Sequence, residues 1–228
     1  MDRSFAKLLF QNILLNLQMQ FALNISIIFS LSALLYSNHS KRRRLILLFK
    51  PLTIILIFIL SITLACCYNI SSYMIFIIMG LFCSIFGDIL LMYKERFLVG
   101  MICFLLTHLC YIQGIYSYGG FHTSYRLIPI LCIWIYFIIT VKTILSHKLK
   151  LPVIVYSILL ACLIWQSCEL ALITFNPSVL FFFAGIILFA ASDWILIVNK
   201  FNNTKLEVLK LPLYFIGQWF IALSITFY

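Results

Sequence analysis

Long apolar stretches, separated by short polar segments, run along the whole chain of 228 residues. A transmembrane helix needs about 20 mostly apolar residues. Backbone groups in lipid must be satisfied within the span, and apolar residues here do not alternate as in a barrel strand, so we expect helices. The eight predicted spans are 16–37, 51–68, 73–93, 97–117, 126–146, 151–174, 178–199 and 211–228. The pattern predicts an all-α integral membrane protein, a bundle of about eight transmembrane helices, with residues 1–228 as a single polytopic domain.

The composition strengthens this interpretation. Hydrophobic residues make up 64% of the chain and charged residues only 10%, whereas about 25% of a soluble domain is charged. The net charge is +10, but the cations lie in short clusters between spans and form no basic face that would bind nucleic acid. No cysteine has the spacing of a zinc site, so we expect no metal.

Basic residues fall in every second connection between spans. The basic residues lie within four connections, at residues 41–44, 94–96, 142–150 and 200–210. The connections at residues 69–72, 118–125 and 175–177 contain no Lys or Arg. The positive-inside rule places the basic connections in the cytosol and both termini outside, although Arg3 and Lys7 favour the opposite orientation. We expect a multi-pass protein of the cytoplasmic (inner) membrane in a bacterium, or of the endoplasmic reticulum in a eukaryote.

The third and seventh spans share a pattern. Gly80 precedes Asp88 by eight residues, and Gly185 precedes Asp193 by eight. We also expect Pro51 and Pro152 to open the second and sixth spans. The period is about 100 residues, which corresponds to four helices and returns the chain to the same side of the membrane. The sequence therefore predicts two parallel four-helix repeats.

Three acidic residues, Asp88, Glu169 and Asp193, lie within spans. An ionisable side chain in a span costs roughly 2.5–3.5 kcal/mol on insertion scales and commonly marks a functional site. Asp88 and Asp193 lie at one depth, roughly 8 Å inside the cytosolic boundary, so they can meet in one site. Two carboxyls that meet do not easily both ionise, which would make one a proton donor and the other a base. Glu169 lies in the outer half of its span, and we expect a structural role for it.

Other polar side chains accompany the two aspartates. The candidate substrate-binding residues are Lys50, His108, Tyr111, Asn199, Lys200, Tyr214 and Gln218. Together they predict a polar cavity that opens to the cytosolic leaflet, with carboxyls below and cations at the rim. A phosphate headgroup suits such cations, which favours a lipid-like substrate attacked near its glycerol. A packing role for His108 and a snorkelling role for the two lysines are the alternatives.

These residues resemble the YhhN family of integral membrane proteins, the lysoplasmalogenases. The matching pieces, in order, are Lys50-Pro51-Leu52, Gly87-Asp88, Phe97-Leu98-x-Gly100, His108-x-x-Tyr111, Ser192-Asp193, Asn199-Lys200-Phe201 and Tyr214-x-x-x-Gln218. Phe215 departs from the pattern, because many members carry a second tyrosine there.

The resemblance implies a hydrolase that cleaves the vinyl ether bond of lysoplasmalogens, which are alkenyl glycerophosphocholines or glycerophosphoethanolamines. The products are a fatty aldehyde and a glycerophospho-alcohol. It further implies that Asp88 and Asp193 form the catalytic acid/base pair, that the partner is a lysophospholipid in the lipid bilayer, and that no metal or organic cofactor is needed.

Three alternatives remain open at this point. A small-molecule or lipid transporter can also have repeats, intramembrane acids and a basic rim, but these acids lie toward one end of their spans. A non-catalytic lipid-binding membrane protein would contain the same cavity without turnover. A related hydrolase could act on another ether or ester lipid.

Overall fold

The computed structural model describes residues 3–144, 147–202 and 207–227, with side chains described over 14–93, 95–139, 150–196 and 208–226. Within these residues the chain forms eight α-helices, two short 3-10 helices and no strand. The elements are α1 (Arg3–His39), α2 (Arg43–Ala65), α3 (Ser72–Leu91), η1 (Lys94–Arg96), α4 (Phe97–Gly119), α5 (Leu127–Ile144), α6 (His147–Thr174), α7 (Pro177–Asn202), α8 (Glu207–Leu223) and η2 (Ser224–Phe227). The predicted all-α bundle is confirmed.

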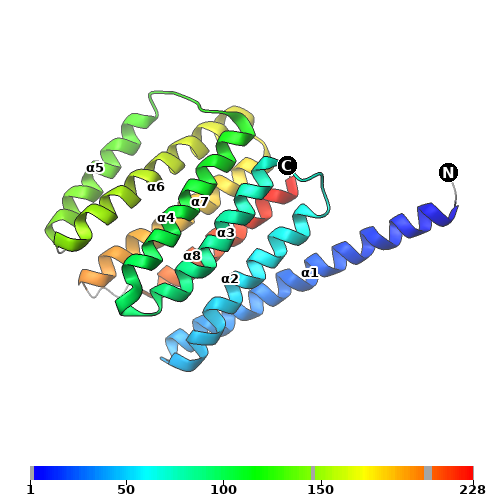
Figure 1. The fold of residues 1–228 in the computed structure, drawn as a ribbon, viewed down its shortest axis with the longest axis horizontal. Coiled ribbons are helices and arrows are strands. Elements are labelled where there is room, and N and C mark those ends of the chain that lie inside the picture. The colour runs from blue at the N-terminus through cyan, green and yellow to red at the C-terminus, as the bar shows by residue number, and fades with distance from the viewer. Residues whose placement is uncertain (1–2, 145–146, 203–206, 228) are drawn as a thin grey trace.

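The outer surface of the bundle is apolar, as expected for a protein surrounded by lipid. Seven of the helices are long and apolar enough to cross a membrane over their described residues, and α5 provides a shorter apolar helix, Leu127–Ile139. Large side chains such as Phe21 and Phe29, each 69% exposed, face outward. The helices lie side by side, with α5 at one margin and α1 diverging from the bundle toward its N-terminal end (Figure 1). The chain is therefore a multi-pass membrane protein.

Four helices, α1, α2, α6 and α8, begin at least four residues earlier than the sequence predicts, and two of these differences concern prolines that were expected to open a span. Pro51 lies inside α2 and Pro152 inside α6, which corrects the expectation that these prolines open their spans. A proline within a helix lacks one N–H and leaves the carbonyl four residues earlier without its partner. Both prolines lie near the basic end of the bundle, where water or polar groups can satisfy that carbonyl, so the helix continues through them.

The two halves of the chain pack in corresponding ways. The most extensive helix contacts are α3 with α4 and α7 with α8, and α2 packs on α3 as α6 packs on α7. Between the halves, α4 packs against α6 as α8 packs against α2. This correspondence supports the predicted pair of four-helix repeats.

Glycines allow the closely packed pairs to approach. A Cβ built on Gly185 in α7 would lie 2.7 Å from the Gly217 carbonyl oxygen in α8, and one on Gly217 would lie 2.8 Å from the Gly185 carbonyl oxygen. At the corresponding place in α3, a Cβ on Gly80 would lie 2.2 Å from Cε1 of Tyr111 in α4. Small residues at such crossings bring membrane helices into backbone contact, and here they fix the helices that carry both intramembrane aspartates.

Replacing Gly185 with alanine should lower the unfolding temperature of the purified protein in detergent, because the new methyl group meets backbone atoms that cannot rotate away. Overpacking of this kind costs about 1–3 kcal/mol. Gly114→Ala is the matched control, because a Cβ there meets its nearest atoms at 3.4 Å or more and alanine favours the helix by about 1 kcal/mol. Equal unfolding temperatures for the two variants would contradict this account of the α7–α8 contact.

Candidate functional site

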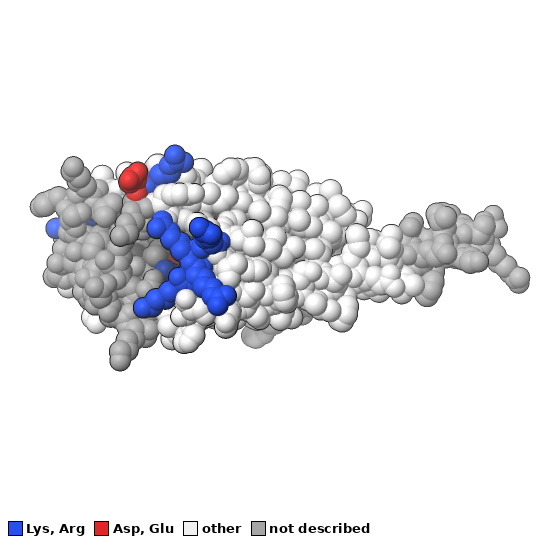
Figure 2. Space-filling view, turned by 90° about the horizontal axis from the view of Figure 1, so that it is seen from below, with Lys and Arg blue, Asp and Glu red and all other residues white. Residues whose placement is uncertain are grey.

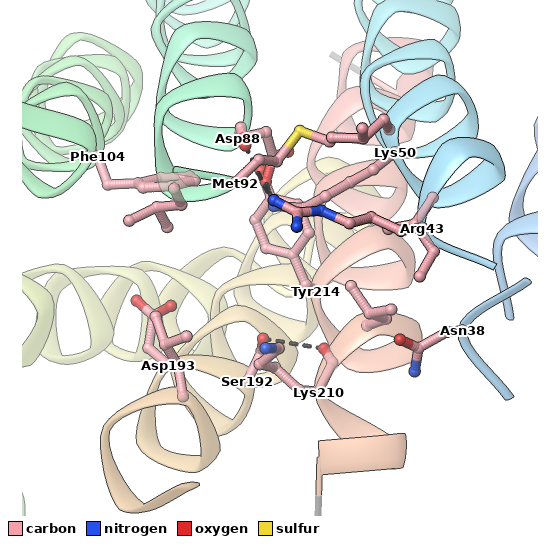
Figure 3. A pocket seen from close by; sticks show the side chains of 15 residues that line it. Asn38, Arg43, Lys50, Asp88, Met92, Phe104, Ser192, Asp193, Lys210 and Tyr214 are labelled. Atoms are coloured by element: carbon pink, nitrogen blue, oxygen red, sulfur yellow. Dashed lines mark hydrogen bonds and ion pairs between the residues drawn. The ribbon is translucent and has the colours of Figure 1, made fainter. Parts of the chain in front are cut away.

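A cavity of about 280 Å³ lies at the end of the bundle where the basic residues gather. Residues from α1, α2, α3, α4, α7 and α8 line it (Figure 3). Viewed from below Figure 1, lysine and arginine side chains cluster in one area of an otherwise largely uncharged described surface (Figure 2). The charged lining residues are Arg43, Lys50, Asp88, Asp193 and Lys210. Both intramembrane aspartates of the predicted site therefore face one cavity.

Asp88 is held by a lysine of the preceding helix. Lys50 in α2 places its Nζ 2.9 Å from Oδ1 of Asp88 in α3, and the same Nζ donates to the Asp88 backbone carbonyl at 3.3 Å. Asp88 is buried, and its Oδ2 accepts no hydrogen bond from any described residue. The cation compensates a buried negative charge and leaves one carboxylate oxygen available at the cavity.

Asp193 is held differently. Its Oδ2 accepts a hydrogen bond from the phenol of Tyr156, which lies in α6. No hydrogen bond joins the Asp193 carboxyl to that of Asp88, and no lysine or arginine forms a salt bridge with it among the described side chains. Each aspartate thus takes its partner from the helix that precedes it in its repeat, but one partner is a cation and the other a neutral phenol. The corresponding aspartates of the two halves therefore have chemically different surroundings.

Tyr214 of α8 and Phe104 of α4 form the inner wall of the cavity. The rings meet edge to face with centroids 5.9 Å apart. The Tyr214 hydroxyl is buried beside the Asp88 carboxyl and makes no hydrogen bond of full geometry within the described part of the chain. A buried hydroxyl without a well-formed hydrogen bond is unusual, so Tyr214 can donate either to Asp88 or to a molecule bound in the cavity. On the opposite side, Ser192 Oγ donates to the Lys210 backbone carbonyl at 3.0 Å and ties α7 to α8.

Of the predicted site residues, Lys50, Asp88, Asp193 and Tyr214 line the cavity. His108 does not, although it lies next to it. The His108 ring packs edge to face against Tyr156 with centroids 4.7 Å apart. His108 is therefore placed to orient the tyrosine that holds Asp193.

Tyr111 and Gln218 form a separate buried network. The Tyr111 hydroxyl donates to Gln218 Oε1 at 2.7 Å, and Gln218 Nε2 donates to Ser84 Oγ at 3.3 Å. Ser84 and Thr107 both bond the Gly80 carbonyl at 3.1 Å. These contacts join α3, α4 and α8, so in the structure the two residues support the helices of the site and do not line the cavity.

The remaining predicted residues, Asn199 and Lys200, have side chains outside the described residues. Sequence reasoning missed Tyr156 and did not assign Arg43 or Lys210 to the site. The predicted repeat carried a signal for Tyr156. If the spacing between the two aspartates is added to the number of Lys50, the resulting position is one residue from Tyr156. Arg43 and Lys210 were visible only as topology residues, since nothing in the sequence shows which loop cations turn toward a cavity.

Glu169 takes the structural role expected of it. It is buried and accepts hydrogen bonds from Arg126 Nη1 at 2.6 Å and Ser124 Oγ at 2.5 Å. Gln166, on the same helix, bonds the His122 backbone N–H at 3.1 Å and carbonyl at 2.9 Å. The pair fastens the connection between α4 and α5 to α6, away from the cavity.

The family model for the YhhN family matches residues 45–225. The chain belongs to the YhhN family. A protein described as a lysoplasmalogenase homolog, from Dictyostelium discoideum, is 27% identical over 197 residues, which cover 69% of this chain. The alignment covers 65% of that protein, so the chain spans less than two thirds of its length. No solved structure shows a significant match.

The matched region contains most of the cavity. Lys50, both aspartates, Lys210 and Tyr214 lie within residues 45–225, as does Tyr156. The cavity residues Asn38 and Arg43 lie before the match begins. The resemblance identified from short motifs is thus confirmed over most of the chain, and the assignment is to a lysoplasmalogenase-like family.

Lys50→Met should destabilise the protein by about 3–5 kcal/mol, because it leaves the buried Asp88 carboxylate without its cation. Adding Asp88→Asn to that variant should recover much of the loss, since the uncompensated charge is then removed. Thermal unfolding in detergent of both single variants and the double variant measures the coupling. Strictly additive losses would show that the 2.9 Å contact contributes no coupling.

Proposed function

We propose that this chain is a membrane-embedded hydrolase that cleaves the vinyl ether bond of lysoplasmalogens, releasing a fatty aldehyde and a glycerophospho-alcohol. The observation that carries the proposal is that two buried carboxyls, each with a different partner, line one cavity with a cationic rim. Membership of the YhhN family, and similarity to a Dictyostelium protein described as a lysoplasmalogenase homolog, support a hydrolase of this kind.

The cavity is suited to a phospholipid with one chain. Arg43 and Lys210 line it together with Lys50, and cations of this kind bind phosphate through charge-assisted hydrogen bonds. With the phosphate at these cations, the glycerol extends inward and the ether oxygen reaches the level of the two aspartates. The Tyr214 hydroxyl, which makes no hydrogen bond of full geometry in the structure, can then donate to the glycerol or ether oxygen.

The different partners divide the acid and base roles. A buried ionised carboxyl requires a compensating cation, and Asp88 has Lys50. Asp193 has a phenol donor on one oxygen, and its other oxygen would carry the proton, because a neutral carboxyl avoids an uncompensated buried charge. In this proposal Asp193 is the general acid and Asp88 is the base.

With these roles, the catalytic cycle needs no reactant other than the substrate and water. Asp193 transfers its proton to the vinyl carbon that is not bonded to oxygen, which leaves an oxocarbenium ion beside the Asp88 carboxylate. Water adds to the cationic carbon and gives a proton to Asp88, forming a hemiacetal. The bond to the glycerol oxygen breaks as Asp88 returns that proton to it, and the hemiacetal hydroxyl proton restores Asp193. Glycosidases use paired carboxyls around a similar cation.

Asp193→Asn and Asp88→Asn should each lower the turnover of lysoplasmalogen by about 100-fold to 10,000-fold, which is the range that general acid–base catalysis contributes. Purified protein in detergent micelles is given an alkenyl glycerophosphocholine, and the released aldehyde is quantified. Tyr156→Phe should lower turnover less, since it removes only the hydrogen bond to Asp193.

Glu169→Gln is the matched control, because it removes a buried intramembrane acid that lies outside the cavity. It should retain turnover of the same order as the unchanged protein. Thermal unfolding of every variant separates loss of fold from loss of chemistry. Undiminished aldehyde release by folded Asp193→Asn and Asp88→Asn proteins would exclude the proposed roles. Absence of turnover by the unchanged protein, with hydrolysis of another ether or ester lipid, would exclude this substrate.

A further inference from the structure

A second cavity, of about 330 Å³, lies between α5, α6 and α7. Asp193 and Tyr156 belong to its lining and lie at one end of it, and Asp193 also lines the polar cavity. Figure 1 shows α5 at the margin of the bundle, beside α6. We call this second cavity the α5–α7 groove. The hydrogen-bonded pair Tyr156–Asp193 is therefore the junction between a cationic cavity and the groove.

Apart from this pair, the groove is suited to hydrocarbon. Its walls are apolar side chains such as Ile133, Leu160 and Ile187, with three alanines that leave space between them. Two of the three other wall residues that carry a polar side-chain group satisfy each other, because Trp134 Nε1 donates to Ser157 Oγ at 3.1 Å; the third is Trp194. A polar ligand would find few partners along these walls, whereas a hydrocarbon chain has no polar group to satisfy there.

The groove extends in the direction that a lipid chain would take. On α6 it runs from Tyr156 to Ile164, which is about 12 Å along the helix axis. It leads away from the basic end of the bundle toward the middle of the helices. Rim cations, aspartates and apolar groove thus follow one another in the same order as the phosphate, glycerol and chain of a lysophospholipid inserted from that leaflet.

We propose that the α5–α7 groove binds the hydrocarbon chain of a single-chain ether phospholipid and places its first carbons beside Asp193. The identity of the reacting bond rests on the proposed function, whereas the binding of the chain in the groove does not depend on it. The groove is about 12 Å long and the hydrocarbon core about 30 Å thick. The groove therefore encloses the part of the chain nearest the reacting bond, and the distal part lies among the membrane lipids.

A photoreactive saturated ether analogue tests the binding directly, because it carries no vinyl bond to cleave. The probe is an alkyl glycerophosphocholine with a diazirine on its chain, added to the full-length protein in micelles, and mass spectrometry locates the attachment. Attachment should concentrate on residues 130–137, 157–164 and 187–194. Excess unlabelled single-chain ether lipid should reduce it, and two-chain phosphatidylcholine should not.

Ala161→Phe fills the groove about 7.5 Å along α6 from Tyr156. It should reduce attachment at least tenfold, as should Ala190→Leu on the α7 wall if the first variant does not fold. Ile158→Phe is the control, because it adds the same ring on α6 at a position that is 40% exposed and outside the groove. It should leave attachment within twofold of the unchanged protein.

Turnover gives the second measurement. Ala161→Phe should lower kcat/KM about tenfold or more for a substrate with a long alkenyl chain. For a substrate whose chain is too short to reach residue 161, the loss should be less than about twofold. Equal loss for both chain lengths, attachment spread evenly over the lipid-facing helices, or equal competition by phosphatidylcholine would each overturn the groove proposal. Specific attachment by a protein that hydrolyses no vinyl ether would support the groove and reject the proposed function instead.

Discussion

The contact between Lys50 and Asp88 is the constraint from which the arrangement of the site follows. A carboxylate within a helical bundle surrounded by lipid must meet a cation or remain protonated. Lys50 lies 2.9 Å from Asp88, which fixes how α2 lies on α3 at the basic end. Asp193 meets a phenol, which fixes α6 on α7 in the same way. The positions that the membrane disfavours most are thus the positions that align the helices of each half.

The close helix pairs supply the rigidity that this requires. Gly185 and Gly217 bring α7 into backbone contact with α8, and the Tyr111–Gln218–Ser84 network joins α4, α8 and α3. These contacts lie outside the cavity and leave its lining to side chains such as Asp88 and Tyr214, whose Oδ2 and hydroxyl make no hydrogen bond of full geometry. The polar groups that join the helices in this network therefore lie at a different depth from the polar groups that face the cavity. The same separation explains why Tyr111 and Gln218 match the family motif without facing the cavity.

The two halves of the chain hold their aspartates in corresponding but unequal ways. Each aspartate takes its partner from the preceding helix, and that partner is lysine in one half and tyrosine in the other. The halves also differ in their surroundings, because α5 leaves an apolar groove that reaches Asp193. A two-carboxyl reaction needs this kind of inequality, since one group must give a proton while the other accepts one.

Hydropathy was sufficient to predict the helices, because apolar runs of span length have few other solutions. It misplaced the starts of α2 and α6, because Pro51 and Pro152 were interpreted as helix boundaries. The helices continue through both prolines, since water or polar groups near the basic end can satisfy the carbonyls that the prolines leave unpaired. The aspartates were found because charge inside a span is conspicuous. Tyr156 was not, because a tyrosine in an apolar helix has no such signature, and its role depends on a hydrogen bond between helices.

Isotopic labelling of the products tests the central claim most directly, namely that a cavity carboxyl protonates a vinyl ether carbon before water attacks. The unchanged protein hydrolyses a lysoplasmalogen in deuterated, oxygen-18-enriched water, and the aldehyde is reduced at once to its alcohol for mass spectrometry. The account predicts one deuterium on the carbon next to the former carbonyl and no oxygen-18 in the glycerophospho-alcohol. Oxygen-18 in the glycerophospho-alcohol, or an aldehyde without deuterium, would contradict it.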